Sequence, residues 1–430
     1  MKDTSEYPKT TQSAWSLDQW LAYLLVIHPT EIDMSLDRVN RVFKRLALDF
    51  SSTRVVTVGG TNGKGSTCRF LELALLQLNK SVGLYSSPHL ISFTERVRLN
   101  DASPSEGQFC EALLHIERIR GDDSLTYFEF STLAALWLIG QAKPDYLILE
   151  VGLGGRLDAT NIVDNELAVI TSIALDHQEY LGDTRESVAF EKAGIFRADK
   201  QIVLGERDVP QVMLTQAQQM AGNIQHKGRE FDFNQTGNAL WSWQGGSFEL
   251  TQLPQPLLLI DNIATALAAL DMLGELVKLN AKPEILRQLI RTAGLPGRFQ
   301  RLSYQPDWIV DVGHNPHAAQ LVVQQLKQLK WDKLYIIVGM MRDKAMRETL
   351  GIFAPLSPTW IPVGLPEARA ATIADLQRAL VGQVCDEAAN DVAEAAQRIM
   401  AKVSPDDVVL VFGSFVTVAE MLTFNAQQRL

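Results

Sequence analysis

Short runs of apolar residues recur along this chain, and segments with helical spacing separate them. In the first half the runs are Arg54–Gly59, Val82–Ser86, Tyr146–Val151 and Leu167–Ser172. Strands that are apolar on both faces are typical of a parallel sheet covered by helices. Alternation of such strands with helices predicts a doubly wound α/β domain. Helical spacing predicts helices over Trp15–Ile27, Ser66–Leu78, Ser105–Arg120, Phe128–Gln141, Ile263–Val277 and Glu284–Arg291.

The chain length and a second set of strands indicate two domains. The chain has 430 residues, and one domain accounts for roughly 150. Gly294-Leu295-Pro296-Gly297 is the best linker candidate, since Gly and Pro interrupt regular structure. We predict a P-loop-type doubly wound domain over 1–293, a linker over 294–300 and a smaller Rossmann-like α/β domain over 301–430. Residues 225–253, which include WSWQGGSFEL, predict a small β excursion within the first domain.

Composition excludes several classes of protein. Forty Lys and Arg against fifty Asp and Glu give a net charge of −10, which provides no general attraction to nucleic acid or anionic membranes. Cys68, Cys110 and Cys385 form no CxxC pair, which excludes a disulfide framework and a zinc ribbon. No apolar run approaches the roughly 18–20 residues that span a bilayer, and the polar start lacks the apolar stretch of a signal peptide. We therefore expect a cytoplasmic protein.

The strongest functional signal is the glycine loop Gly60–Ser66, which follows a predicted strand and opens a predicted helix. Glycines let backbone N–H groups surround a phosphate, and a helix N-terminus adds positive potential. Lys64 would reach the outer phosphates, and the Ser66 hydroxyl would contact Mg²⁺. The spacing departs from the common GxxxxGK[ST], because Val58 stands at the first Gly and Gly65 follows the Lys. A glycine-rich turn without a ligand is the alternative, but the strand–loop–helix context favours nucleotide binding.

Polar side chains follow three more of the predicted strands. Glu150 ends one strand, Ser87 follows another, and His177 follows a third. The carboxyl ends of parallel strands line the ligand crevice of such sheets, and a carboxylate suits Mg²⁺. The alternatives are an ion pair of Glu150 with Arg156, a Ser-Pro turn at Ser87 and a structural role for His177. Beside a phosphate loop we favour metal binding by Glu150, and we interpret His177 as a metal ligand or general base.

Two further segments carry polar residues. Glu191–Ile195 is a charged turn near a helix end, where a lysine is usually solvated. Asp311–His317, with the sequence DVGHNPH, follows a predicted strand and opens a helix. Four polar residues placed in this way indicate a site rather than a surface loop.

Taken together and in this order, the motifs resemble those of the bacterial folylpolyglutamate synthase/dihydrofolate synthases of the Mur ligase superfamily. The resemblance covers nearly the whole chain. It implies an ATP-dependent carboxylate–amine ligase that works through an acyl phosphate and joins L-glutamate to dihydropteroate and to tetrahydrofolates. It also implies ATP as a substrate and two Mg²⁺ ions. We expect a monomer, and the net charge of −10 argues against binding to nucleic acid or to a membrane. The motifs are GGTNGKGS, YSSPHL, LTYFE, EVGLGGRLDATN, SIALDH, EKAGIF, PGRF, DVGHNPHA and GSF.

The resemblance also implies roles for individual residues. ATP contacts fall on Gly60, Thr61, Asn62, Gly63, Lys64, Gly65, Ser66, Asn262, Arg298 and Asp311. Metal ligands fall on Ser87, Glu150, His177 and Lys192, with Lys192 carbamylated. Pterin-side contacts fall on Asp33, Met34, Ser35, Leu36, Thr126, Leu157, Asp158 and Ala159, and glutamate-side contacts on His314 and Ser414. The catalytic residues implied are Lys64, Lys192, His177 and His314. The chain departs from the family pattern at Met34-Ser35, at Gly313 and at Ala345.

Two other functions are compatible with parts of the pattern. A superfamily ligase that extends a cell-wall precursor shares the glycine loop and the HNP motif, but LTYFE and GGRLDATN argue against it. An NTPase switch that regulates a partner would hydrolyse nucleotide without making a ligated product. Polar strand ends in both predicted domains fit an enzyme better than a switch.

Overall fold

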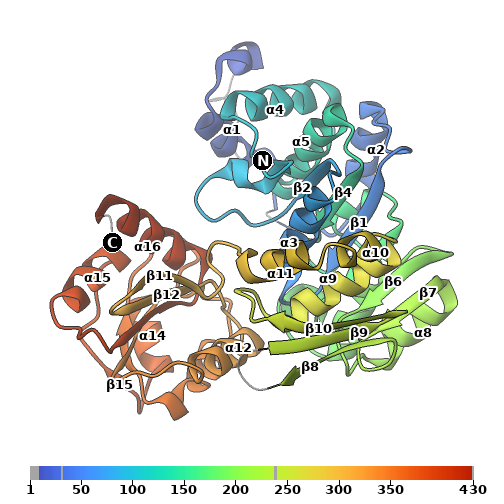
Figure 1. Cartoon of the computed structure of the whole chain (residues 1–430). Coiled ribbons are helices and arrows are strands. Elements are labelled where there is room, and N and C mark those ends of the chain that lie inside the picture. The colour runs from blue at the N-terminus through green and yellow to red at the C-terminus, as the bar shows by residue number, and fades with distance from the viewer. Residues whose placement is uncertain (1–8, 31, 237–239, 429–430) are drawn as a thin grey trace. The chain divides into compact units, whose positions relative to one another are not determined.

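The structure is a computed structural model that describes residues 9–30, 32–236 and 240–428. The chain divides into two units, Met1–Ala293 and Gly294–Leu430 (Figure 1). Within the described residues, no helix is both long and apolar enough to cross a membrane. Each unit is built on a mainly parallel sheet flanked by helices, so the predicted α/β class is confirmed.

A seven-stranded sheet in the order β3-β2-β4-β1-β5-β6-β7 forms the centre of the first unit. All neighbouring pairs are parallel except β2 and β3. The side chains of β2, β4 and β5 are buried throughout, as expected for a sheet covered on both faces. The strands are β1 (Arg54–Gly59), β2 (Val82–Tyr85), β3 (Val97–Leu99), β4 (Tyr146–Glu150), β5 (Leu167–Ile170), β6 (Lys200–Leu204) and β7 (Ala221–His226).

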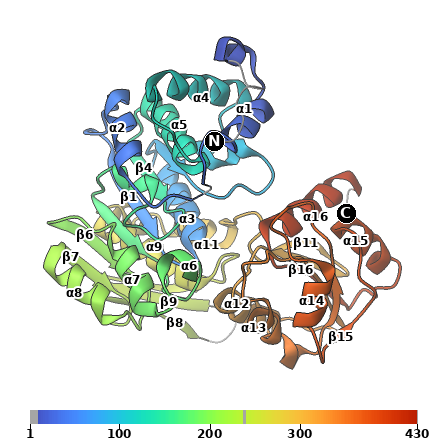
Figure 2. The ribbon, with the colours of Figure 1, turned by 180° about the vertical axis from the view of Figure 1, so that it is seen from behind.

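Helices cover this sheet and bury two separate apolar clusters. Helices α4 and α5 pack on each other and α5 packs beside β2 (Figure 1), while α7 and α8 pack together near β6 (Figure 2). The helices are α1 (Leu17–Leu24), α2 (Asp37–Leu46), α3 (Lys64–Gln77), α4 (Glu106–Arg120), α5 (Tyr127–Ala142), α6 (Gln178–Leu181), α7 (Arg185–Ala193), α8 (Gln211–Met220), α9 (Ile260–Met272), α10 (Leu276–Asn280) and α11 (Pro283–Thr292). Short 3₁₀ helices span Lys9–Ala14, Phe93–Arg96 and Ala159–Ile162.

A three-stranded antiparallel sheet forms the predicted β excursion. Its strands are β8 (Phe231–Thr236), β9 (Leu240–Gly245) and β10 (Phe248–Pro254), in the order β10-β9-β8. The excursion begins later than predicted, because Gln225 still belongs to β7 and pairs with Val203 of the large sheet. Residues 237–239 of the predicted segment lie outside the described part of the chain. The buried Trp243 donates its indole N–H to the Ala264 carbonyl at 3.1 Å, which attaches this small sheet to α9.

The second unit has a six-stranded sheet in the order β11-β12-β16-β13-β14-β15. Only the pair β11–β12 is antiparallel. The strands are β11 (Gln300–Tyr304), β12 (Asp307–Asp311), β13 (Leu334–Val338), β14 (Thr359–Pro362), β15 (Val384–Cys385) and β16 (Val408–Phe412). The helices are α12 (Pro316–Leu326), α13 (Met346–Gly351), α14 (Ile373–Ala379), α15 (Val392–Met400) and α16 (Phe415–Gln428), with a 3₁₀ turn at Ala354–Leu356.

Two predicted helices differ from the structure. The first covers only Leu17–Leu24. It begins at Leu17 because the Ser16 side chain accepts a hydrogen bond from the Gln19 N–H and caps the helix. The single helix predicted over Ile263–Val277 is divided into α9 and α10. Helix α9 ends at Met272 with Leu273 as its C-cap, and the next residue, Gly274, adopts a left-handed conformation with φ of +71°.

Candidate active site

Four predicted site segments follow neighbouring parallel strands of the first unit. Ser87 follows β2, Glu150 ends β4, the glycine loop follows β1, and His177 follows β5. The carboxyl ends of these strands meet at one edge of the sheet, and Glu150 of β4 lies opposite Val58 of β1. From β1 the chain passes first to β2 and later to β5 on its other side, so this edge is a topological switch point. The structure therefore brings the four segments to the edge where ligands bind in such sheets.

The residues after β5 hold the glycine loop in place. The Thr61 N–H donates to the Ser172 carbonyl at 2.8 Å, and the Thr61 hydroxyl donates to the Ala174 carbonyl at 2.9 Å. The Thr171 hydroxyl donates to the Asn62 carbonyl at 2.6 Å. These bonds tie the loop to the residues after β5 before α3 begins.

Lys64 lies at the start of α3 and turns its ammonium toward the loop. Its Nζ donates to the carbonyl of Gly60 at 2.9 Å and to that of Thr61 at 3.1 Å. This places a cation beside the N-terminus of α3, where the helix dipole also favours an anion. The arrangement suits the recognition of a polyphosphate.

Asn262, in the first turn of α9, packs against the glycine loop. A Cβ atom on Gly63 would lie 2.3 Å from the Asn262 side-chain oxygen, so the loop and the amide are in direct contact. Asn262 is buried, and its carbonyl accepts a hydrogen bond from the Thr67 hydroxyl at 3.5 Å. Two segments almost two hundred residues apart thus form one surface of the candidate nucleotide site.

Gly63→Ala is expected to weaken the binding of ATP and to destabilise the protein. The residue has φ of +88°, and its new Cβ would overlap the Asn262 amide. A left-handed non-glycine residue alone costs roughly 1–2 kcal/mol. The measurements are the KM for ATP and the free energy of unfolding in urea. Gly107→Ala is the matched control, because Gly107 lies exposed in α4 and its Cβ would approach no atom closer than 3.9 Å.

Lys192 is buried in the last turn of α7, although a lysine in such a charged turn is usually solvated. Its exposed fraction is 4%. Burial, together with the nearby charge of Lys64, lowers the pKa of Lys192 to about 7, although Asp176 and Asp158 act in the opposite direction. A lysine with this pKa is partly uncharged at neutral pH, so its amine is available to react with carbon dioxide.

The oxygen donors at the sheet edge fit Mg²⁺. Glu150 is buried. Burial of the Cys68 thiol raises its pKa, and the negative charge of Glu150 raises that pKa further. No group of three His, Cys, Asp or Glu side chains gathers as a metal-binding cluster within 9–30, 32–236 and 240–428. Mg²⁺ needs no such cluster, since it commonly takes one or two carboxylates, waters and substrate phosphates. His177 is exposed and has a left-handed backbone with φ of 51°.

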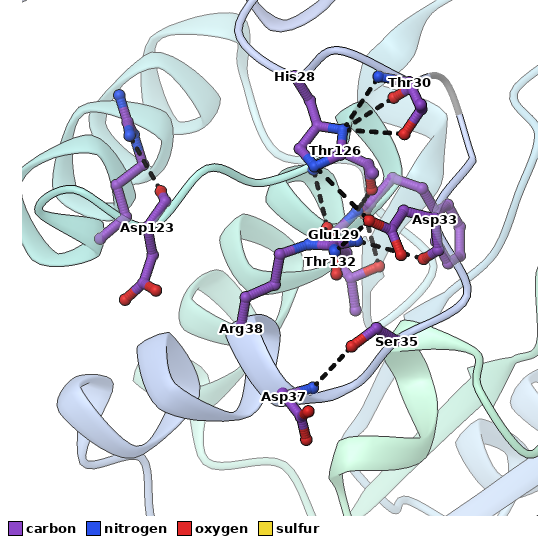
Figure 3. A network of polar contacts seen from close by, with 12 residues as sticks. His28, Thr30, Asp33, Ser35, Asp37, Arg38, Asp123, Thr126, Glu129 and Thr132 are labelled. Atoms are coloured by element: carbon purple, nitrogen blue, oxygen red, sulfur yellow. Dashed lines mark hydrogen bonds and ion pairs between the residues drawn. The ribbon is translucent and has the colours of Figure 1, made fainter.

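The predicted pterin-side residues come together beside α5. Figure 3 shows Asp33 and Glu129 gathered around Arg38, with Thr126 next to them. The terminal methyl group of Met34 lies 3.9 Å from the place where a Cβ of Gly154 would be, so this loop also reaches the segment after β4. The structure thus brings segment 33–36, Thr126 and the segment that contains Leu157, Asp158 and Ala159 into one region.

Asp158 uses both carboxylate oxygens within its own loop. One oxygen accepts from the Leu153 N–H at 2.8 Å, and the other from the N–H and hydroxyl of Thr160 at 3.0 and 2.6 Å. Burial raises the pKa of Asp158, although these hydrogen bonds oppose the shift. Asp158 therefore shapes the loop, and its contact with a pterin stays a prediction.

In the second unit, the predicted residues lie at one edge of its own sheet. Asp311 ends β12 and lies opposite Phe412, the last residue of β16. Ser414 lies two residues beyond the end of β16. The Asp311 carboxylate accepts from the N–H groups of Gly313 at 2.7 Å and of Phe299 at 2.8 Å; burial raises its pKa, although the charge of Arg298 opposes the shift.

Three more contacts define this edge. The Arg298 guanidinium lies over the Phe415 ring at 5.2 Å from its centroid. His314 Nδ1 lies 2.9 Å from the Val312 carbonyl. The buried Ser414 oxygen accepts from the Thr417 N–H at 3.1 Å. Asp311, Arg298, His314 and Ser414 are thus held at the carboxyl ends of two adjacent parallel strands.

Sequence reasoning missed Arg38 and Glu129. The capping box from Thr126 to Glu129 is visible in the sequence as T-x-x-E before an apolar run. Arg38 has no such local signal, because its partner Glu129 is 91 residues away.

The structure has two α/β units, a glycine loop after β1 and polar residues at strand ends in both units, as expected for a Mur ligase. Residues 58–272 match the Mur ligase middle domain, and residues 297–415 match the Mur ligase, glutamate ligase domain.

Individual relatives narrow the class. The Escherichia coli protein named dihydrofolate synthase/folylpolyglutamate synthase is 44% identical over 415 residues, which are 96% of both chains. The chain belongs to the dihydrofolate synthase/folylpolyglutamate synthase family. A structure of E. coli FolC in complex with DHPP and ADP has a TM-score of 0.92 and 43% identity, covering 97% of this chain and 100% of that one. A bifunctional folylpolyglutamate synthase/dihydrofolate synthase with Mn, AMPPNP and L-glutamate bound has a TM-score of 0.88 and 44% identity, covering 97% and 99%.

Proposed function

We propose that this protein is an ATP-dependent ligase that joins L-glutamate to dihydropteroate and to reduced folates. The observation that carries the proposal is the meeting of the glycine loop, the buried Glu150 and the segment with His177 at one sheet edge. The names of the relatives and the ligands in their structures (DHPP, ADP, AMPPNP, Mn and L-glutamate) support it. We further propose that it acts in the cytoplasm as a monomer, without nucleic acid or membrane.

The proposed chemistry activates a carboxylate, which is by itself a poor acyl donor. A carboxylate oxygen of the pteroate or folate attacks the γ-phosphorus of ATP, and the bond to the ADP oxygen breaks. The glutamate amine then attacks the acyl carbon of the mixed anhydride and displaces phosphate. Phosphoryl transfer of this kind depends mainly on positioning and charge neutralisation.

The chain's own residues supply that positioning. Lys64 and the N–H groups of residues 60–66 would bind the triphosphate, with Asn262, Arg298 and Asp311 as further nucleotide contacts. Ser87, Glu150, His177 and a carbamylated Lys192 would hold two Mg²⁺ ions, which neutralise charge on the phosphates when bound. Segment 33–36, Thr126 and residues 157–159 would contact the pterin. His314 and Ser414 would contact glutamate.

An isotope experiment tests this order of bonds. The substrate carboxylate is labelled with heavy oxygen, and one turnover is run with ATP, Mg²⁺ and glutamate. We expect one labelled oxygen in each phosphate released, because the acyl phosphate loses its bridging oxygen to phosphate. Unlabelled phosphate formed in step with the amide product would show that water attacks ATP. Phosphate without any ligated product would favour an NTPase instead.

Glu150→Gln is expected to suppress the transfer of label by about 10²-fold or more, since an uncharged amide is a weaker ligand for Mg²⁺ than a carboxylate. The measurement is labelled phosphate formed in a single turnover at several Mg²⁺ concentrations. Raising Mg²⁺ should recover part of the rate. A variant with the wild-type rate and Mg²⁺ dependence would remove Glu150 from the proposed metal site.

A further inference from the structure

The segment Asp33–Leu36 depends on side-chain contacts for its conformation. Residues 32–35 belong to no helix or strand. Within the segment, the Ser35 N–H donates to the Asp33 carbonyl at 3.0 Å, and the Ser35 hydroxyl accepts from the Asp37 N–H at 3.4 Å. Helix α2 then starts at Asp37 without a side-chain cap at Leu36. Contacts from outside the segment must therefore decide where it lies.

Met34 and Leu36 pack on apolar clusters, and His28 Nε2 lies 3.9 Å from the Asp33 carboxylate. Arg38 adds hydrogen bonds to Asp33 from the first turn of α2. Its Nη1 donates to the Asp33 carboxylate at 2.5 Å, and its Nη2 donates to the Asp33 carbonyl at 3.2 Å. The same guanidinium donates through Nε to Glu129 at 2.9 Å. The Arg38 and Glu129 side chains are 13% and 5% exposed, so this ion pair is shielded from solvent, whereas the Asp33 side chain is 38% exposed. One planar group thus fixes Asp33 from two sides and joins it to α5.

Glu129 connects Arg38 to Thr126 through hydrogen bonds. A single oxygen of Glu129 accepts from both Arg38 Nε and the Thr126 N–H, the latter at 2.8 Å. The Thr126 hydroxyl in turn accepts from the Glu129 N–H at 3.2 Å. The second Glu129 oxygen is buried without a hydrogen-bond partner among the described residues, so Arg38 is important for balancing this charge.

We propose that Arg38 is a positioning residue that sets the distance between segment 33–36 and Thr126, and that it thereby tunes the binding of the pterin substrate. This rests on the proposed function, which places both segments on the pterin side. Arg38 acts through Asp33 and Glu129 rather than through the reacting atoms. Its removal should therefore weaken the binding of the pterin substrate and leave the binding of ATP and glutamate unaffected. Figure 3 shows the network of Asp33, Arg38, Glu129 and Thr126 on which this expectation rests.

The test compares Arg38→Gln with the wild type in steady-state ligation of glutamate to dihydropteroate. We expect the KM for dihydropteroate to rise about tenfold or more. Without the guanidinium, neither segment 33–36 nor Thr126 is held in position for the pterin. The KM values for ATP and L-glutamate should stay within about twofold. Arg38→Lys should recover only part of the loss, since an ammonium does not reproduce the planar fork that holds Asp33 and Glu129 together.

Arg45→Gln is the matched control on the same helix. Arg45 also donates to a carboxylate, Asp123 at 2.7 Å, and to two backbone carbonyls, and these partners lie outside segment 33–36. We expect the melting temperature to fall more for Arg38→Gln, which leaves the buried Glu129 charge without its ion pair, than for Arg45→Gln, whose side chain is 45% exposed. The KM for dihydropteroate should change only for Arg38→Gln. Equal increases in both variants would overturn the proposal, because they would indicate general destabilisation.

Further outcomes separate this inference from the proposed function. If the wild type makes no amide product, the proposed function fails. If the wild type is active and Arg38→Gln keeps its KM for dihydropteroate, the inference fails alone. An equal rise in the KM for ATP would also overturn it. If Arg38→Gln does not fold, Arg38→Lys and equilibrium binding of dihydropteroate decide: unchanged affinity in that variant overturns the proposal.

Discussion

Lys192→Met is expected to abolish nearly all ligase activity while the protein still folds. The apolar stem of methionine fills the buried space, so loss of the amine should not unfold α7. We expect turnover to fall by about 10³-fold or more if a carbamylated Lys192 supplies a metal-binding carboxylate. Short carboxylic acids should restore part of the activity. Lys200→Ala is the control, because Lys200 is exposed at the start of β6.

The pH dependence of Lys192 follows from its pKa of about 7. Below this pH the amine is protonated and cannot take up carbon dioxide, so activity should fall as the pH falls through 7. Between about 7 and about 10 the unfolded chain binds a proton at this lysine that the folded chain does not, so the free energy of unfolding should rise with pH. Lys192→Met should remove that rise. A carbon-13 signal from labelled bicarbonate, present in the wild type and absent in the variant, is the direct measurement. Absence of this signal from the active wild type would contradict carbamylation.

Lys64→Ala is the second change with a large expected effect. Lys64 lies at the N-terminus of α3 and donates to the carbonyls of Gly60 and Thr61. Removal of this cation should lower kcat/KM for ATP by about 10³-fold, since preorganised charge near a transferring phosphate is worth several kcal/mol. The loop should keep its shape, because Thr61 and Asn62 remain bonded to the residues after β5. Thermal unfolding should therefore change little.

The same Lys200→Ala control shows how far the loss of any lysine affects turnover. Wild-type turnover in a folded Lys64→Ala protein would contradict the assignment of the glycine loop to ATP. A loss of turnover that is accompanied by unfolding would instead assign Lys64 a structural role through its bonds to the loop carbonyls.

Local signals were sufficient to predict the α/β class. The apolar run Arg54–Gly59 and the glycine loop after it lie within fifteen residues, and the structure has a strand, a loop and then α3 there. The parallel arrangement places the ends of β1, β2, β4 and β5 at one edge, as the polar strand ends suggested. The start of the excursion was predicted too early, because residues 225 and 226 belong to β7, which pairs with β6 in the large sheet.

The sequence by itself determined most of the elements and the glycine loop, because periodicity and glycine spacing act over a few neighbouring residues. The family resemblance rests instead on the order of the motifs along nearly the whole chain. Only the tertiary structure decided the state of Lys192, since a charged turn indicates exposure while packing buries the amine and lowers its pKa. The same holds for Arg38 and Glu129, whose ion pair joins residues 91 positions apart. Burial and long-range pairing depend on which elements pack together, and no local pattern contains that information.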